Sequence, residues 1–514
     1  MLLLVAIFLC VISFFLIKML LKRQKLPPGP FPLPLIGNMH QLYYKMFIKK
    51  KTFIEALREW DKEYGSVHTI WFGPIALVNI CDYHNAVDAM VKKGSTFADR
   101  SVPYLFDLIR NSRGIVVSNG LPWIEQRRFA LHTLRNFGLG KNIIEGRIML
   151  EFQTVCDELE KRLDAGQTSI DPHAIFELLI GNIINRILFA SRFDKKEEEE
   201  FFVLKAKMDA ALESFSLFDI MIDEWNINLP IFKQRAQYIL RSLQLLIDFL
   251  RERVQQRRRD IELGNHVIED GGVDFVDAFL IQMKNKDSAN LTSFNEEMLV
   301  MSLFDLSLAG QQTTLSTLKW AFSYLLLNPE MSFIQIKAQV EEELLSVTKG
   351  ERPLSITDRP NTPFYNATLT MSYYHYDEIH RCALIVPFNL WRNTDEDVVV
   401  GPYVIPRGTA IAAQISLIMT DEKYFKDKYK FNPKRFLNGA RLEQMVVSFG
   451  LGKRACLGES LAQAELYLVI IANFLLQYIV SSDPLHMPSM KAQNELGTMR
   501  RPQPYHIVFQ RRKA

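Results

Sequence analysis

A short segment near the C-terminus has the residue types needed to bind a metal. It is Phe449-Gly-Leu-Gly-Lys-Arg-Ala-Cys-Leu-Gly458, and an apolar stretch from 459 to about 478 follows it and is predicted to be a helix. Cys456 would lie at the N-terminus of this helix, where the helix dipole and free backbone N–H groups favour a thiolate. The glycines allow the backbone to turn tightly and to lie close to a flat partner. A thiolate can be an axial ligand of iron, and Arg454 could pair with an acidic group of the same ligand; the alternative is that Cys456 is a small buried apolar residue.

The long stretch from 293 to about 327 is predicted to be a single helix. Ser293-Phe-Asn-Glu296 predicts a capping box at its start, and Asn328-Pro329 predicts its end. Such a helix is about 50 Å long and would cross the molecule. In its middle, Ala309 and Gly310 leave room for a flat group to approach, and Thr313 can hydrogen-bond to a backbone carbonyl and bend the helix. The alternative is a buried helix in which these residues have no function.

Both segments resemble motifs of the cytochrome P450 family. Residues 449–458 match the haem-binding pattern Phe-x-x-Gly-x-Arg-x-Cys-x-Gly without a mismatch, and 309–313 resembles the oxygen-activation motif Ala-Gly-x-(Asp/Glu)-Thr. The likeness extends over almost the whole chain. It implies a mainly α P450 fold with small peripheral β-sheets, and a bound haem b (iron protoporphyrin IX). It also implies that Cys456 is the iron ligand, that Phe449 and Ala309 lie against the haem, and that Arg454 contacts a haem propionate.

The resemblance breaks at one catalytic position, because Gln312 stands where the family has an acidic residue. A carboxylate there belongs to the family's proton relay, and an amide cannot transfer a proton in the same way. Thr313 is retained. We therefore expect Thr313 and Gln312 to be the catalytic pair, with slower or less coupled oxygen activation rather than a new reaction.

Further haem contacts are predicted from an indole and three guanidinium groups. Trp123 and Arg127 are four residues apart and would lie on one face of a helix. Both donate hydrogen bonds, as a propionate requires. By resemblance, Arg100 and Arg392 are additional propionate donors. For any single arginine, the alternative is a solvated surface charge.

A buried charge network is implied behind the cysteine loop. Glu378 and Arg381 match the family's Glu-x-x-Arg motif, and Arg435, in an Asn-Pro-Lys-Arg-Phe segment, matches a later arginine, although Lys434 stands where the family has Glu. A second departure precedes this network, because residues 371–377 have no counterpart in related chains. They are either a genuine insertion or an error in the gene model.

The N-terminus predicts attachment to a membrane. Residues 1–22 are almost wholly apolar and long enough to cross a bilayer, and basic residues follow directly. Residues 23–38 form a basic, proline-rich hinge in which extended backbone is enforced. Residues 39–514 are expected to be one catalytic domain. The alternative for the apolar stretch is a cleaved signal peptide, although the charges do not precede it.

Composition narrows the function and the coarse fold. The net charge of +3 does not indicate nucleic-acid binding, and five widely spaced cysteines without a CxxC pair argue against a disulfide scaffold or a structural zinc site. Helices are expected at 142–166, 171–191, 194–212 and 236–262. Strands are expected at 68–78, and a hairpin at 398–412 with its turn at 406–408.

The leading interpretation is a monooxygenase of the endoplasmic reticulum membrane, single-pass and facing the cytosol. It would insert one oxygen atom of O₂ into an apolar substrate such as a xenobiotic, a fatty acid or a steroid-like molecule. No Rossmann or flavin motif occurs, so NADPH would act through NADPH-cytochrome P450 reductase, with cytochrome b5 as a further candidate partner. The alternatives are a haem-binding protein with little or no turnover and a haem-thiolate isomerase or dehydratase. Predicted cavity walls are 101–117, 210–229, 303–313, 385–390 and 495–499.

Overall fold

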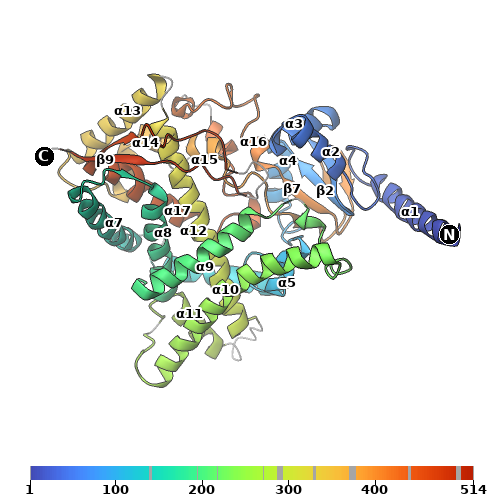
Figure 1. Cartoon of the computed structure of the whole chain (residues 1–514), viewed down its shortest axis with the longest axis horizontal. Helices are drawn as coiled ribbons and strands as arrows, with labels where there is room; N and C mark the ends of the chain where they lie inside the picture. Colours follow the sequence, from blue (N-terminus) through green and yellow to red (C-terminus); the bar gives the residue numbers. More distant parts are fainter. Residues whose placement is uncertain are drawn as a thin grey trace.

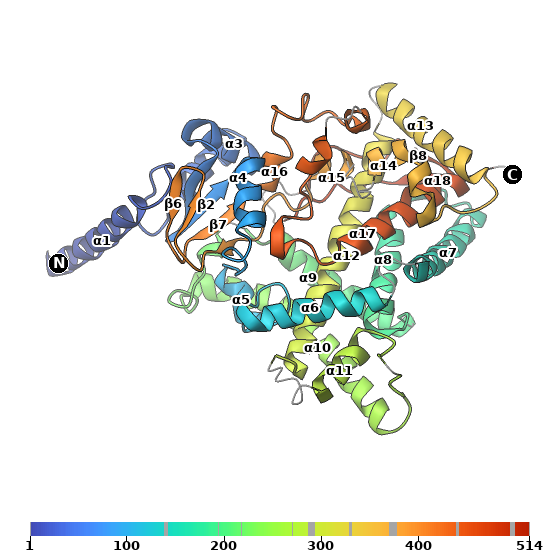
Figure 2. The same cartoon turned by 180° about the vertical axis from the view of Figure 1, so that it is seen from behind.

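The body of the protein is mainly helical and is built around one long helix, α12, which runs through its middle (Figures 1 and 2). This computed structural model describes residues 2–137, 142–193, 195–216, 218–269, 271–285, 293–327, 331–369, 378–437, 441–493 and 499–512. The α-helices are α1 (Leu2–Arg23), α2 (Met39–Tyr43), α3 (Phe53–Tyr64), α4 (Tyr83–Val87), α5 (Tyr104–Arg110), α6 (Gly120–Asn136), α7 (Asn142–Asp164), α8 (Pro172–Phe189), α9 (Lys195–Glu213), α10 (Pro230–Glu262), α11 (Phe275–Asn285), α12 (Glu296–Leu326), α13 (Met331–Thr348), α14 (Pro363–Leu369), α15 (Glu378–Ala383), α16 (Ile415–Ile418), α17 (Glu459–Glu465) and α18 (Phe474–Gln477).

Three small sheets lie at the edges of the helical body. The strands are β1 (Val67–Phe72), β2 (Ile75–Ile80), β3 (Ser169–Ile170), β4 (Arg392–Asn393), β5 (Val398–Val400), β6 (Tyr403–Ile405), β7 (Ala410–Ala413), β8 (Tyr478–Ser482) and β9 (Ile507–Arg511). The sheet orders are β1-β2-β7-β4, β3-β9-β8 and β5-β6. The predicted fold class, mainly α with small peripheral sheets, is confirmed.

The central helix α12 is buried along most of its length because apolar residues occur all around it. Trp320 and Phe322 are fully buried, and α12 packs most extensively against α8. The predicted capping box was wrong. The N-cap is Asn295, whose side chain accepts from the Met298 N–H. The Ser293 hydroxyl instead donates to Glu125.

The stretch after the cysteine loop is helical but changes its winding. Residues of α17 are followed by a π-helical segment, Leu466–Asn473, and then by α18. Tyr478 begins strand β8 instead of ending the helix. The helix expected from 459 to about 478 is thus three consecutive segments.

The strands near residue 400 differ from the predicted hairpin. The turn lies at 401–402, because β5 pairs antiparallel with β6. Strand β7 leaves this hairpin and pairs in parallel with β2, with Val78 opposite Ile411. The Pro-Arg-Gly segment at 406–408 is the connection between the two sheets and not a hairpin turn.

The N-terminal helix α1 projects away from the body in both views (Figures 1 and 2). Within the residues that the structure describes, no helix is long and apolar enough to span a membrane, so the predicted span at 1–22 is not confirmed. The proline-rich segment after α1 packs against β1, where Thr69 hydrogen-bonds to the carbonyls of Pro27 and Pro28. The insertion predicted at 371–377 lies outside the described residues.

Candidate functional site

Two connected cavities meet at the middle of α12. One, of about 340 Å³, is lined by Cys456 and Phe449 from the cysteine loop and by Ala309 and Thr313 from α12. The other, of about 790 Å³, shares these two α12 residues as lining and does not include the cysteine loop in its walls. The structure therefore brings together the two segments that the sequence singled out, although they are far apart along the chain.

The cysteine loop is held by its glycines and by backbone hydrogen bonds. Gly452 has φ +71°, and a Cβ atom there would lie 1.6 Å from the carbonyl oxygen of Met90. This glycine is needed because the loop packs against the chain at residues 88–92, and not to admit a flat partner. The Cys456 N–H donates to the Phe449 carbonyl at 2.8 Å, which turns the loop so that Cys456 lines the smaller cavity.

The thiol of Cys456 does not follow the simple helix-dipole expectation. Burial raises its pKa, whereas the N–H groups of Gly458 and Glu459 and the nearby Arg127 act in the opposite direction. Desolvation is the largest of these effects on its pKa. The helix end favours the thiolate but does not by itself produce one.

Four arginines gather around the smaller cavity, and the only acid that acts on the pKa of one of them, Asp99 on Arg454, forms no ion pair among the described residues. Burial and repulsion from Arg392 and Arg127 lower the pKa of Arg454 to about 9. Burial and repulsion from Arg127 lower the pKa of Arg392 to about 10. Burial, followed by repulsion from the other three, lowers the pKa of Arg100. Among the described residues, none of the four is in an ion pair, so the cluster carries an excess of positive charge.

Several hydrogen-bond donors of this cluster are also unused. The buried atoms Trp123 Nε1, Arg100 Nε, Arg392 Nε and Asn389 Nδ2 have no hydrogen-bond partner among the described residues. The guanidinium carbon of Arg454 lies 3.8 Å from the centre of the Trp123 ring, which orients both groups. Buried donors are rarely left unpaired. Together the unused donors and the excess charge indicate a binding site for a group with carboxylates.

The middle of α12 presents Ala309 and Thr313 to both cavities. The Thr313 hydroxyl donates to the Ala309 carbonyl at 2.7 Å, as the sequence suggested, although α12 continues through this point. Gly310 has a different reason for being small. A Cβ atom there would lie 2.7 Å from Cδ1 of Ile184, so Gly310 allows α8 to pack closely against α12.

Gln312 lines the larger cavity and is buried. Its Nε2 atom donates to both carboxylate oxygens of Asp209 on α9, at 2.7 and 2.8 Å. The sequence analysis missed Asp209, because a single aspartate in an amphipathic helix carries no motif. A carboxylate is thus present next to position 312, although residue 312 itself is an amide.

Glu378 lies in contact with both arginines of the implied charge network. Arg381 donates to the two carboxylate oxygens of Glu378 at 2.7 and 2.9 Å, and Arg435 donates at 3.1 Å. Glu378 and Arg381 are fully buried. Each arginine also donates to the Lys430 carbonyl, so the network ties α15 to the chain that precedes the cysteine loop.

Comparison with known proteins agrees with this arrangement. The family model for cytochrome P450 matches residues 27–509. The probable cytochrome P450 cyp-35D1 of Caenorhabditis elegans is 36% identical over 482 residues, which cover 93% of each chain. Cytochrome P450 2C8 of Homo sapiens is 32% identical over 498 residues, 95% of this chain and 94% of its own length. Cytochrome P450 2C3 of Oryctolagus cuniculus is 32% identical over 510 residues, 97% of each.

The chain belongs to the cytochrome P450 family. It is therefore a monooxygenase of the oxidoreductase class, and the family's cofactor is haem. The residues present fit this group, because the P450 carries unpaired arginines and unused donors suited to propionates beside Cys456. A metal cation deprotonates a coordinating thiol. Bound iron would therefore favour the Cys456 thiolate, which the helix end alone does not produce.

Two acidic residues line the P450 cavities without a role assigned from the sequence, although Asp305 lies within the predicted wall 303–313. Asp305 on α12 forms a buried ion pair with Arg110 at 3.0 Å and accepts from the N–H groups of Ile115 and Val116, both at 2.9 Å. Burial raises the pKa of Glu465 to about 8, although the Thr314 hydroxyl opposes the shift. Neither acid belongs to a sequence motif. Only their burial in the folded protein distinguishes them from ordinary surface acids on helices.

The larger cavity is mainly apolar, and most of the predicted walls contribute to it. Residues from 101–117, 210–220, 305–313 and 386–391 line it, together with Met499. Residues 495–498 lie outside the described part of the chain. The sequence analysis missed one wall, which comes from the N-terminal body and its sheet and includes Phe53, Phe72 and Leu77.

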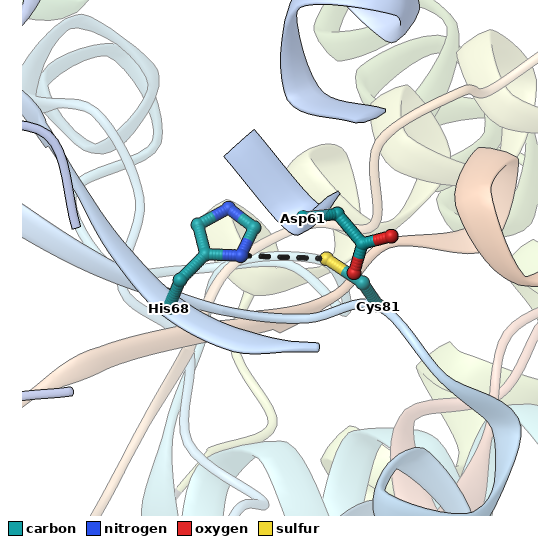
Figure 3. Close-up of side chains that lie close together, drawn as sticks. All are labelled: Asp61, His68 and Cys81. Atoms are coloured by element: carbon teal, nitrogen blue, oxygen red, sulfur yellow. Dashed lines mark hydrogen bonds between the residues drawn. The ribbon is translucent and has the colours of Figure 1, made fainter. Parts of the chain in front are cut away.

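Asp61, His68 and Cys81 form a separate cluster where α3 meets β1 and β2 (Figure 3). His68 Nδ1 lies 3.0 Å from the Gly65 carbonyl and 3.9 Å from Cys81 Sγ. Burial raises the pKa of Asp61 to about 6, raises that of Cys81 and lowers that of His68. All three shifts favour uncharged side chains, so we interpret this cluster as a polar contact within the fold.

Proposed function

We propose that this P450 inserts one oxygen atom of O₂ into a medium-sized apolar organic molecule, with electrons from an NADPH-dependent reductase. The observation that carries the proposal is the mainly apolar cavity of about 790 Å³, which meets the arginine-lined cavity at Ala309 and Thr313. A substrate in the larger cavity would lie next to the group held in the smaller one. Ligand sites of this size and composition suit apolar molecules.

Residues in and around the smaller cavity have the following roles in this proposal. Bound haem, ligated by a thiolate, would supply the cleavage of the O–O bond. Cys456 would hold the iron, and Trp123, Arg100, Arg127, Arg392 and Arg454 would hold the propionates. Thr313 would orient water at the face of α12, and the small side chain of Ala309 would leave room for the haem. Apolar walls exclude bulk water from the site.

The electrons would enter on the side of the cysteine loop. Arg128 and Arg135 are exposed on α6, and Lys453 is exposed in the loop itself. Lys430 is exposed as well, whereas Lys428 is paired with Glu422 at 2.7 Å. Unpaired basic side chains near this face support docking of an acidic flavoprotein, because complementary charge speeds association. Cytochrome b5 is a second candidate for the same face.

Attachment to the endoplasmic reticulum membrane, with the catalytic domain in the cytosol, is part of the proposal. Exposed apolar side chains occur in the segment 31–36 and again in 218–231, including Phe31, Leu35, Phe218, Trp225 and Ile231. The two segments are brought together at Gly73, which lies close to the Leu35 carbonyl and the Met221 side chain. Such a surface beside α1 suits contact with lipid.

A carbon monoxide difference spectrum of the reduced protein tests the haem-thiolate site directly. We expect the band typical of thiolate ligation, and its loss in Cys456→Ala. Reconstitution with an NADPH-dependent reductase and apolar substrates then tests turnover. Haem binding with no product under these conditions would instead support a haem-binding protein without turnover.

A further inference from the structure

We propose that Asp209 on α9 supplies the proton-relay carboxylate that α12 lacks at position 312. The inference rests on the proposed oxygenase function and adds the source of its protons. Asp209 does not replace Gln312 in the cavity wall. It lies behind Gln312, which holds it by two hydrogen bonds. Asp209 is therefore the relay residue that passes its proton to water, and Gln312 is the residue that positions it and does not itself carry the proton.

The contact fixes the orientation of the Gln312 side chain. Because both carboxylate oxygens of Asp209 can only accept, the atom between them must be the amide nitrogen, Nε2, at 2.7 and 2.8 Å. A glutamate at 312 could not make this contact, since two carboxylates would face each other in a buried place. An amide at position 312 is therefore compatible with a relay in which the carboxylate belongs to the neighbouring helix, α9, instead of α12.

A chain of charged side chains connects Asp209 with the surface. Lys205 Nζ lies 2.9 Å from Asp209 and 2.6 Å from Glu177. Glu177 lies 3.4 Å from Nε2 of His173, whose side chain is 41% exposed, whereas the side chain of Lys205 is 2% exposed. The contacts of Lys205 with Asp209 and Glu177 are within reach of direct proton transfer, and the step from His173 to Glu177 would pass through one water molecule.

The proposed transfer conserves protons and charge along the chain. Lys205 gives a proton to the Asp209 carboxylate and regains one from solvent through His173 and Glu177. Asp209 passes its proton to a water molecule at the Gln312 amide, beside Thr313. One proton enters at the surface and one leaves in the cavity, and every side chain returns to its starting state.

The alternative is that Asp209 is only a structural member of an ion-pair network. Arg501 also faces Asp209, at 3.9 Å, and forms an ion pair with Glu213. Removing Asp209 would then affect stability alone. The two roles are separable, because Gln312→Glu with Asp209→Asn exchanges acid and amide without changing the size of either side chain.

The first experiment measures thermal unfolding of the full chain for both single variants and the double variant. We expect Gln312→Glu to lower the unfolding midpoint, because two acids then meet. Adding Asp209→Asn should restore most of the loss. Independent, additive effects of the two substitutions would overturn the proposed contact, and this result does not depend on turnover.

The second experiment measures product formed per NADPH oxidised, hydrogen peroxide release and the solvent isotope effect on turnover. Positioned acid–base groups contribute about 10²–10⁴-fold in rate. Water can replace part of this, so we expect Asp209→Asn to lower coupling by about 10-fold and to raise the isotope effect. Glu200→Gln, an exposed acid on the same helix, is the matched control.

The double variant decides between relay and structural roles. It restores one carboxylate to the contact between positions 209 and 312. The ratio of product formed to NADPH oxidised should therefore recover together with stability. Recovery of stability without recovery of coupling, or unchanged coupling and isotope effect in Asp209→Asn, would overturn the relay. Loss of the carbon monoxide band in the unmodified protein would instead refute the proposed function itself.

Discussion

The two polar regions that border the cavities differ in how their charges are balanced. Around the smaller cavity, Arg100, Arg127, Arg392 and Arg454 have no acidic partner among the described residues. Between α9 and α12, cations and anions alternate, and each charged group lies within 4 Å of an opposite one. An unbalanced cluster is stable only with a bound anion, whereas a balanced chain can hold and move charge by itself. The comparison separates a region with excess positive charge, suited to the proposed haem, from a region of paired charges, suited to the proposed proton relay.

Removing one charge from a buried network of paired charges should have the largest effect on stability. Glu378→Gln would leave Arg381 and Arg435 buried beside an amide, and it turns a balanced network into an unbalanced one without a ligand. We expect the free energy of unfolding to fall by about 3–5 kcal/mol, measured by chemical denaturation. Glu200→Gln, which removes an exposed acid, should leave it almost unchanged. A loss below about 1 kcal/mol would show that Glu378 does not balance these charges.

Removing Arg454 from the unbalanced cluster should lower both haem affinity and the stability of the apoprotein. Arg454→Met removes one positive charge, and hydrogen bonds to charged groups contribute about 1.5–3 kcal/mol. We expect haem affinity to fall by about 10- to 100-fold in titrations of the apoprotein. The apoprotein should also be less stable, because the buried Arg454 donates to the Ala98 and Ser118 carbonyls and to Asn119, and these acceptors would lose their donor. Unchanged haem affinity in Arg454→Met would contradict this account.

Asp61 is a third case, because it is a partly buried acid that belongs to neither the arginine cluster nor the ion pairs between α9 and α12. Burial raises its pKa to about 6, from 3.8, so the folded state binds the proton more tightly than the unfolded state. Its favourable contribution is complete below about pH 4 and is lost as the pH rises toward 6. Asp61→Asn should therefore raise the free energy of unfolding at pH 7 by about 1–2 kcal/mol. The difference from the unmodified protein should disappear near pH 4, and a constant difference across this range would contradict the assignment.

The smallest effect on both regions is expected from shortening α1. Removing residues 2–15 keeps Leu16 and Met19, which pack against Trp71 and Ala76, and touches neither charged region. The free energy of unfolding should change by less than about 0.5 kcal/mol, and haem binding should be retained. Membrane binding in sedimentation assays should fall but not vanish, because the apolar segments 31–36 and 218–231 remain. Full retention on membranes would show that α1 contributes nothing to attachment.

Local patterns were sufficient for the features that depend on neighbours in the chain. The cysteine loop, the pairing of Trp123 and Arg127 on one helix face, and the contact of Glu378 with Arg381 involve residues at most a few turns apart. Spacing along a helix decides which side chains share a face, so these positions could be predicted. The excess of arginine around the cavity could not be predicted, because the sequence does not show which acidic residues lie near these arginines in the folded protein.

Only the tertiary structure decided the contacts between distant segments. Asp209 and Gln312 are 103 residues apart, and Arg110 and Asp305 are 195 apart. Strand β7 left its expected hairpin to pair with β2, and Gly452 and Gly310 proved to be small because Met90 and Ile184 pack against them. Sequence by itself determined the family and the helical class, since these depend on short motifs and periodicity, and it singled out Cys456 as the predicted iron ligand. Which acid meets position 312, and which wall closes the cavity, depended on packing between helices and sheets, where apolar burial and charge pairing select one partner among many.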